Sequence, residues 1–240
     1  MSKVCVIGGG PAGLSAAYYL RLAGHAVTIY DAMPEMGGML RYGIPEYRLP
    51  KAVLRKEVES IKKLGVEMKN NVKVGQDITF EDIKANADAV LVAIGAWKGS
   101  SIRCKGEELD GVLSGIDFLR EVNMGARPDL GKNVAVVGGG NVAIDVSRTA
   151  VRCGASKVTQ VSLETRDIMP ALPEEIEIAE SEGIELQGGW GPKEILTENG
   201  KVTGIVFKKC TQVKNAEGRF DPKYDENDTM TIECSNVLLS

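Results

Sequence analysis

The sequence is poor in the residues that most catalytic and metal sites use. His25 is its only histidine, which excludes histidine-based triads and histidine-rich metal centres. Five cysteines are present, and no two lie within three residues of each other: Cys5, Cys104, Cys153, Cys210 and Cys234. This spacing excludes a local Cys-x-x-Cys redox pair and a cluster-binding run, and it is typical of scattered thiols in a reducing cytoplasm. We expect a cytoplasmic protein without a metal site.

Long runs of one kind are also missing. There is no basic run, and the net charge is −4, so nucleic acid is not indicated as a partner. No apolar segment approaches the ~20 residues that cross a membrane, and no secretory leader is visible. The hydrophobic share of 43% and the charged share of 26% are ordinary for a globular protein. The length of 240 residues predicts one or two domains.

One glycine-rich pattern occurs twice, and the copies are 130 positions apart (Gly138 minus Gly8). The first copy is VCVIGGGPAG, in which Pro11 and Ala12 precede Gly13. The second copy is VAVVGGGNVA, which includes Asn141 and Val142. Each copy places a β-branched run before the glycines and a helical pattern after them, which is the arrangement of a dinucleotide-binding βαβ unit.

The chemistry of the loop explains these residue types. The first glycine allows a tight turn, the second lets the backbone approach a pyrophosphate, and the third position must be small for helix and strand to pack. The phosphates then lie at the helix N-terminus, where unpaired N–H groups and the helix dipole favour negative charge. Two such loops predict two dinucleotides, and the economical pair is FAD with a nicotinamide nucleotide.

The expected secondary structure follows from these two units. We predict strand–helix–strand at 4–7, 11–22 and 26–30, and again at 134–137, 142–152 and 158–163. Residues 66–74 are predicted as a strand pair or an extended segment, and 97–131 as a connection with a helix at 115–122. After an acidic helix at 173–182 we predict strands at 204–209 and 229–234, with a polar turn over 215–228. The run at 236–240 reads as the start of a buried strand, so we expect the chain to be truncated.

An acidic residue follows the second strand of each copy. Asp31 lies 23 residues after Gly8, and Glu164 lies 26 residues after Gly138. A carboxylate at this place accepts hydrogen bonds from ribose hydroxyls. At Glu164 it would also repel an adenosine 2′-phosphate, which favours NADH over NADPH, whereas Arg166 could bind that phosphate.

The loop over residues 33–50 is long and rich in glycine, proline and tyrosine. Loops of this length in a compact domain are usually functional. The backbone amides of Gly37 and Gly38 could let a flavin approach closely, and Arg48 could bind a phosphate through two hydrogen bonds. The alternative is an ordinary Ω-loop in which the glycines serve turns.

Several motifs together resemble one enzyme family. They are the first glycine loop, the stretch GGMLRYGIPEYRLP at 37–50, AIGA at 93–96, GGGNVAID at 138–145 and MPALPEE at 169–175. With these motifs the chain resembles the small subunit of NADPH-dependent glutamate synthase. The same module occurs in dihydropyrimidine dehydrogenase and, more distantly, in adrenodoxin reductase. The resemblance extends over nearly the whole chain.

The resemblance implies an α/β fold with two Rossmann-like domains, in which an NAD(P)H domain is inserted into an FAD domain that lacks its closing segment. It implies an incomplete FAD domain over 1–100, a connector over 101–131 and an NAD(P)H domain over 132–240. It also implies cofactor contacts within these motifs. For FAD they are Gly8, Gly10, Pro11, Ala12, Gly13, Asp31, Gly37, Gly38, Met39, Arg48, Val74 and Gly95. For the nicotinamide nucleotide they are Gly138, Gly139, Gly140, Asn141, Val142, Glu164 and Arg166.

The function so implied is hydride transfer from NAD(P)H to FAD, with electrons passing to an iron–sulfur partner. No side chain is predicted to be catalytic, because the cofactors supply the chemistry while the protein supplies orientation and electrostatics. Relatives often carry paired basic residues where this chain has Leu163 and Glu164, which again favours NADH. The alternative is a non-catalytic nucleotide-binding or docking fragment of a larger complex.

Overall fold

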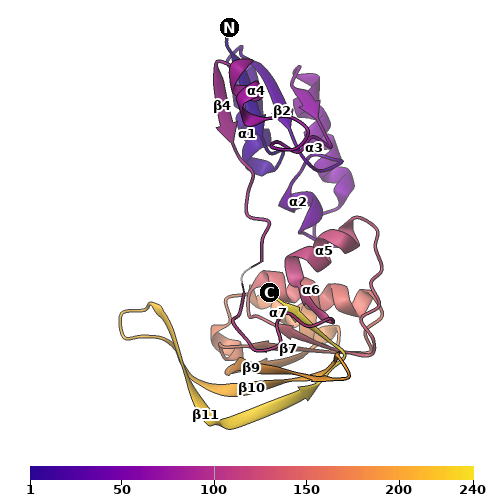
Figure 1. Ribbon diagram of the computed structural model, residues 1–240, viewed down its shortest axis with the longest axis vertical. Coiled ribbons are helices and arrows are strands. Elements are labelled where there is room, and N and C mark those ends of the chain that lie inside the picture. Colours follow the sequence, from indigo (N-terminus) through magenta and orange to yellow (C-terminus); the bar gives the residue numbers. More distant parts are fainter. Residues whose placement is uncertain (100) are drawn as a thin grey trace. The chain divides into compact units, whose positions relative to one another are not determined.

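The computed structural model describes residues 1–99 and 101–240, and these form two compact units, Met1–Trp97 and Lys98–Ser240. The predicted boundary of the first domain, Ser100, lies outside the described residues. Each unit is an α/β unit built on a parallel sheet (Figure 1). The predicted fold class is confirmed in this respect.

The first unit contains a four-stranded sheet in the order β3-β2-β1-β4, and all its strands are parallel. Its core forms because β1 and β2 are short apolar runs, whose Val6 and Ile29 are completely buried against α1 and α3. In chain order the elements are β1 Lys3–Ile7, α1 Pro11–Leu22, β2 Ala26–Tyr30, α2 Met39–Tyr42, α3 Lys51–Lys63, β3 Glu67–Lys69, α4 Phe80–Ala85 and β4 Ala89–Val92.

One prediction for this unit needs correction. Of the extended segment expected at 66–74, only β3 is a strand, while Val74 forms a single bridge with Ile78. The turn between Val74 and Ile78 then leads into α4, where Thr79 and Asp82 form a capping box.

The second unit contains a five-stranded parallel sheet in the order β5-β12-β6-β7-β8. A separate antiparallel sheet in the order β11-β10-β9 completes it. In chain order the elements are β5 Val112–Ser114, α5 Gly115–Asn123, β6 Asn133–Val137, α6 Asn141–Arg152, β7 Lys157–Ser162, the 3₁₀ turn η1 Arg166–Ile168, α7 Pro173–Ser181, β8 Glu185–Gly188, β9 Trp190–Glu198, β10 Lys201–Lys214, β11 Phe220–Glu233 and β12 Asn236–Leu239.

The parallel sheet of this unit is covered on both faces. Alternate residues of β6 point to opposite sides, so Val134 and Val136 pack against α5, α6 and α7, whereas Ala135 and Val137 pack against β9 and β10. Strands buried on both faces must be apolar throughout, which is why the sequence around 134–137 reads as one hydrophobic run. Figure 1 shows the helices and the antiparallel sheet on opposite sides of the unit.

Residues 101–131, expected as a connector, are part of the second unit. They supply β5, which pairs with β12, and α5, whose Phe118 and Leu119 enter the helical face of the core. The short strand β5 lacks the length and the hydrophobic run by which a strand is recognised. The run at 236–240 does contain a strand, β12, and its Val237 and Leu238 are completely buried.

The polar turn predicted at 215–228 is wrong over most of its length. β10 and β11 are 14 residues each, and only the segment between Lys214 and Phe220 turns. The strands form a long ribbon that extends beyond β9 (Figure 1). The polar residues of this ribbon do not predict strands, because a ribbon exposed on both faces has no alternation of buried and exposed positions.

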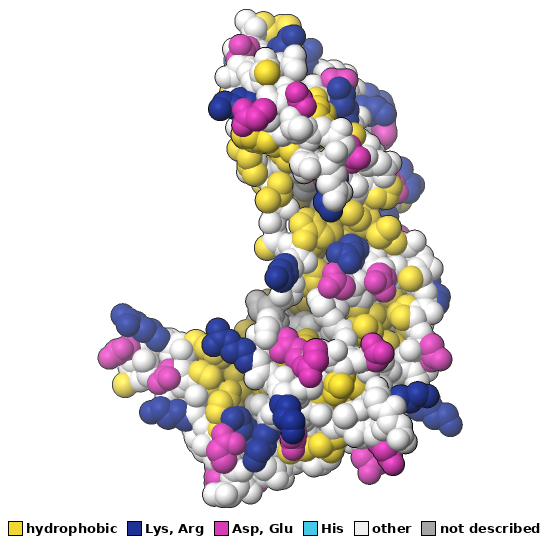
Figure 2. Space-filling view, viewed as in Figure 1, with side chains coloured by type: hydrophobic (Ala, Val, Ile, Leu, Met, Phe, Trp, Pro, Cys, Tyr) yellow, Lys and Arg dark blue, Asp and Glu magenta, His cyan; other side chains and the backbone are white. Residues whose placement is uncertain are grey.

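Within residues 1–99 and 101–240, no helix is long and apolar enough to cross a membrane. β4 forms one edge of the first sheet, and Leu91, Val92 and Ile94 on and beside it are exposed. Figure 2 shows hydrophobic side chains gathered on the visible face of the first unit.

An ion-pair network joins α6 to α7 in the second unit. Arg148 contacts Glu175 and Glu182, each at 2.9 Å, and Arg152 contacts Glu182 at 2.6 Å. The hydrogen bond from Arg152 holds the pKa of Glu182 at about 2, with further help from Arg148 and against the effect of burial. The carboxylate of Glu182 therefore contributes to stability while it is ionised.

We expect Glu182→Gln to lower the free energy of unfolding of this unit by ~1–2 kcal/mol at pH 7, after allowance for solvent screening. The pKa of Glu182 is lower in the folded than in the unfolded state, where it is near 4.5. The difference between wild type and variant is therefore complete above that pH and shrinks as the pH falls towards 2. Urea denaturation at pH 7 and pH 3 measures it. Glu177→Gln, on α7, which ends just before Glu182, is the control. A pH-independent loss in Glu182→Gln would contradict the linkage.

Candidate functional site

The first glycine loop joins β1 to α1 at the carboxyl end of the sheet. The N–H of Gly8 donates to the carbonyl oxygen of Tyr30 at 2.8 Å, which fixes the end of β1 beside the end of β2. Gly8 has a φ of +107°, and a Cβ there would overlap the carbonyl oxygen of Ala93. The loop therefore turns tightly against the segment after β4, and α1 starts at Pro11 with its N-terminus open.

Asp31 lies directly beneath this loop. Its carboxylate is buried and accepts hydrogen bonds from the N–H of Gly9 at 2.5 Å and of Met33 at 2.8 Å. The charge of Asp31 thus holds the second glycine of the loop in place. This is the position, at the end of the second strand, that the spacing of Asp31 predicted.

The loop after β2 returns to the same place. The N–H of Gly37 donates to the carbonyl oxygen of Gly9 at 2.8 Å. Gly38 has a φ of +52°, and a Cβ on it would lie 2.6 Å from the Cα of Gly10. The two backbones are in direct contact, so no side chain fits between them.

These segments enclose a cavity of about 210 Å³ in the first unit. Eight residues predicted to contact FAD line it: Gly8, Gly10, Pro11, Ala12, Asp31, Gly38, Met39 and Gly95. The cradle of glycine backbone at the start of α1 fits the pyrophosphate and ribose of a dinucleotide, since Gly8, Gly10 and Gly38 line it without side chains. The residues present therefore fit FAD, and their role in binding stays a prediction.

Four residues predicted for FAD do not line this cavity. Gly13 packs against Gly8, and Gly37 packs against Leu54. Arg48 lies in the turn after Pro45, whose carbonyl oxygen accepts from its N–H at 3.1 Å. Val74 packs against Cys5 and Ile7 on the opposite side of β1 from α1.

Sequence reasoning missed Trp97, which lines the cavity together with Ala93 and Ile94. The ring of Trp97 lies 5.9 Å from that of Tyr42. The position of Trp97 shortly after β4 could have identified it, because the carboxyl ends of parallel strands meet at one edge of the sheet. Lys51 was also missed. Its ammonium donates to the carbonyl oxygens of Leu40 and Ile44 and so secures the turn that carries Met39.

The second glycine loop repeats the geometry of the first. The N–H of Gly138 donates to the carbonyl oxygen of Val161 at 2.8 Å, and its φ is +146°. Gln160 supports the turn, since its side-chain amide donates to the carbonyl oxygen of Gly138 at 3.1 Å. No atom lies within 4 Å of a Cβ placed on Gly140, so the loop is open at the start of α6. Val142 in the first turn is exposed.

Glu164 takes the place in this unit that Asp31 has in the first. A Cβ on Gly139 would lie 2.9 Å from Oε2 of Glu164, so the carboxylate faces the second glycine of the loop. Its backbone is fixed by Ser162, whose hydroxyl donates to the carbonyl oxygen of Glu164 at 2.8 Å. Arg166 points elsewhere: its guanidinium donates two hydrogen bonds to Glu180, at 2.7 and 2.6 Å.

Asn141, which is predicted to contact the nicotinamide nucleotide, makes a hydrogen bond within the protein. Its side-chain oxygen accepts from the N–H of Leu172 at 2.8 Å, and the carbonyl oxygen of Gly139 accepts from Ala171 at 3.1 Å. These bonds attach the Met-Pro-Ala segment to the glycine loop. They explain why that motif occurs together with the second glycine pattern.

The cysteines form no disulfide within residues 1–99 and 101–240. Burial raises the pKa of Cys104 to about 11 and that of Cys234 to about 12, which removes their reactive thiolate form at neutral pH. In the described part of the chain, no group of three His, Cys, Asp or Glu side chains is arranged to hold a metal ion.

Two α/β units, each with a glycine loop and a carboxylate at the second strand's end, define the class of oxidoreductases that bind two dinucleotides. The sequence model of one family, pyridine nucleotide-disulphide oxidoreductase, matches residues 2–239. The chain belongs to this family, and membership implies FAD and NAD(P)H as cofactors.

Named relatives agree with this assignment. The chain is 44% identical over 90% of its length to the NADP(+)-dependent formate dehydrogenase subunit beta of Moorella thermoacetica. It is 40% identical over 98% to the NADPH-Fe(3+) oxidoreductase subunit beta of Geobacter sulfurreducens, and 36% identical over 98% to the glutamate synthase [NADPH] small chain of Azospirillum brasilense. It spans only 30%, 36% and 52% of these relatives.

Solved structures show the same fold. FprA from Mycobacterium tuberculosis, in complex with NADPH, superposes with a TM-score of 0.84 at 19% identity, over 100% of this chain and 70% of FprA. A thioredoxin reductase from T. acidophilum superposes with a TM-score of 0.70. The predicted resemblance to the glutamate synthase small subunit is confirmed by these comparisons.

Proposed function

We propose that this chain binds FAD in its first unit and NAD(P)H in its second, and that it passes reducing equivalents to an iron–sulfur partner. The observation that carries the proposal is the repeated geometry. In each unit a carboxylate from the end of the second strand faces the middle glycine of the loop, Asp31 at Gly9 and Glu164 at Gly139. A dinucleotide needs this pair of features, an amide-lined helix N-terminus and an acceptor for ribose hydroxyls.

The cofactors supply the chemistry when bound, which is hydride transfer from a reduced nicotinamide to a flavin. The chain's own residues bind and orient them. The amides at the start of α1 and α6 hold the phosphates, and Asp31 and Glu164 accept from ribose hydroxyls. Trp97 lines the first cavity, and its ring lies 5.9 Å from that of the buried Tyr42.

The domain limits follow from the same argument. We infer that residues 1–97 form the FAD unit and that residues 98–240 form the nicotinamide-nucleotide unit. The connector expected at 101–131 belongs with the second, because β5 and α5 complete its sheet and its helical face.

We infer that NADH is the preferred donor, because Glu164 faces the loop and Arg166 is held by Glu180. The iron–sulfur partner is inferred from the resemblance in sequence. Two of the named relatives are themselves described as subunits.

An anaerobic titration of the FAD-reconstituted chain, followed by flavin absorbance, tests the proposal. We expect NADH to bleach the flavin at a lower concentration than NADPH does, and Glu164→Gln to reduce that difference, since the repulsion of a 2′-phosphate is removed. Asp167→Asn is the control, because it also removes one negative charge close to Glu164 in the sequence. Failure to retain FAD, or retention without bleaching, would contradict the proposed activity and favour a docking fragment.

A further inference from the structure

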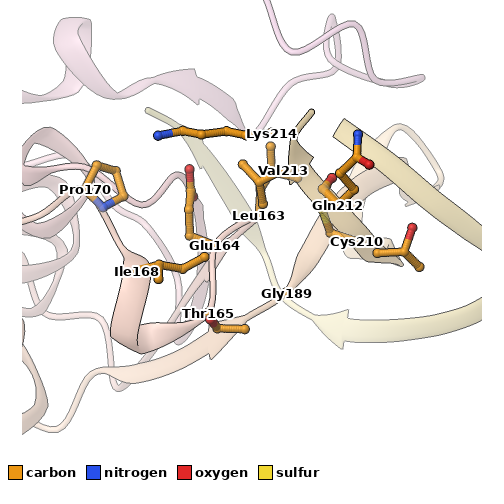
Figure 3. A pocket seen from close by; sticks show the side chains of 11 residues that line it. Leu163, Glu164, Thr165, Ile168, Pro170, Gly189, Cys210, Gln212, Val213 and Lys214 are labelled. Atoms are coloured by element: carbon orange, nitrogen blue, oxygen red, sulfur yellow. Dashed lines mark hydrogen bonds between the residues drawn. The ribbon is translucent and has the colours of Figure 1, made fainter. Parts of the chain in front are cut away.

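The second unit has a cavity of about 600 Å³ beside its glycine loop. One wall comes from the segment after β7, and the other comes from the distal half of β10 (Figure 3). The residues that line it are Leu163, Glu164, Thr165, Ile168, Pro170, Gly189 and the five residues from Cys210 to Lys214. Its volume is within the usual range for a small-molecule site, and its lining is mostly apolar with a few polar groups.

The distal half of β10 reaches this place because the ribbon is irregular. Its pairing with β11 shifts register three times between Lys208 and Lys214. The N–H of Cys210 donates to the carbonyl oxygen of Gly189 at 2.9 Å, which attaches the strand beside the end of β8. Register shifts of this kind bend a strand and redirect its side chains. A segment about 50 residues from Glu164 in sequence thus forms the facing wall.

The cavity has one carboxylate and one ammonium group among its lining residues, Glu164 and Lys214. Figure 3 shows Lys214 extending from β10 across the cavity, towards the side where Glu164 and Pro170 lie. Within residues 1–99 and 101–240, Lys214 forms no ion pair. Arg166, the cation that the sequence offered for this place, is absent from the lining and is paired with Glu180.

We propose that Lys214 recognises the substituent at the 2′ position of the adenosine ribose. Its ammonium binds the 2′-phosphate of NADPH, while Glu164 accepts from the 2′-hydroxyl of NADH, so Lys214 lets the cavity accept NADPH besides the preferred NADH. This rests on the proposed function, which places the nicotinamide nucleotide at the second loop. Lys214 would then be a specificity-determining residue from the β10–β11 ribbon, far along the sequence from the glycine loop and from Glu164 but facing the same cavity.

Binding of two adenosine probes to the full chain tests this role. 2′,5′-ADP carries the extra phosphate, and 5′-ADP lacks it. We expect Lys214→Met to weaken 2′,5′-ADP binding about tenfold or more, since a charge-assisted hydrogen bond to phosphate is lost, and to change 5′-ADP binding less than about twofold. Lys214→Arg keeps the charge and should retain 2′,5′-ADP binding. Calorimetric titration gives both dissociation constants.

Lys223→Met is the matched control, because Lys223 lies opposite Gln212 on the same ribbon but does not line the cavity. It should leave the ratio of the two dissociation constants unchanged. An unchanged ratio in Lys214→Met, or wild-type binding of 5′-ADP without 2′,5′-ADP, overturns the role of Lys214 alone. If wild type binds neither probe nor NADH, the proposed function of the second unit fails, and this inference fails with it.

Discussion

Replacing Gly10 with valine is expected to abolish FAD retention without unfolding the first unit. Gly10 precedes α1 in an extended conformation, with φ −75° and ψ −176°, which valine adopts readily. A Cβ there meets only the Cα of Gly38, at 3.7 Å. The added side chain occupies the cavity wall where the phosphates are proposed to bind. Loss of two charge-assisted hydrogen bonds, each worth ~1.5–3 kcal/mol, weakens FAD binding roughly 100-fold or more.

The measurement is the ratio of flavin to protein after gel filtration, with a thermal melt of the apoprotein. We expect almost no flavin in Gly10→Val and a melting temperature near that of the wild type. Gly9→Val is the contrasting variant, because its side chain would overlap Met36 and it should lower the melting temperature as well. Normal flavin content in Gly10→Val would place FAD somewhere other than this cavity.

Replacing Gly140 with valine is expected to separate the two cofactors. Gly140 is also extended, with φ −91° and ψ 175°, and a Cβ on it has no neighbour within 4 Å. Valine blocks the open N-terminus of α6, so phosphates lose their backbone donors there. We expect FAD to be retained while bleaching by NADH requires roughly 100-fold more nucleotide or is not observed, from the loss of the same kind of bonds.

Anaerobic titration with NADH measures this effect, and dithionite provides the control. Dithionite should still reduce the flavin of Gly140→Val, which shows that the flavin itself is intact. Together the two glycine variants assign one cofactor to each unit. A Gly140→Val variant that is reduced by NADH like the wild type would mean that the second loop does not bind the donor.

Much of the fold was predictable, because glycine loops impose strong local requirements. The strands and helices on either side of Gly8 and Gly138 were predicted nearly to the residue, and so were the places of Asp31 and Glu164. In these segments the apolar runs, the start of the helix and the need for small residues all indicate the same structure. The secondary structure of a segment can be predicted from its sequence when independent local preferences agree.

The parts that could not be predicted depend on distant partners. β5 is three residues long and is a strand only because β12 lies beside it. The β10–β11 ribbon is polar and therefore reads as a turn, although its hydrogen bonds run over most of its length. The wall contributed by Lys214 depends on register shifts in that ribbon, and no local pattern encodes them. Arg166 was a reasonable candidate because it lies two residues after Glu164. Its ion pair with Glu180 depends on the tertiary fold and cannot be read from the local sequence.

The position of β12 has a consequence for the order in which the chain matures during synthesis. β12 lies between β5 and β6, and its Asn236 donates to the carbonyl oxygen of Gly111, 125 residues earlier. The four strands of the first sheet, in contrast, have all been made once β4 has been synthesised. Non-local pairings form late, and domains fold as units while the ribosome is still working. The first unit should therefore be able to bind its nucleotide before β12, an interior strand of the second sheet, has been synthesised.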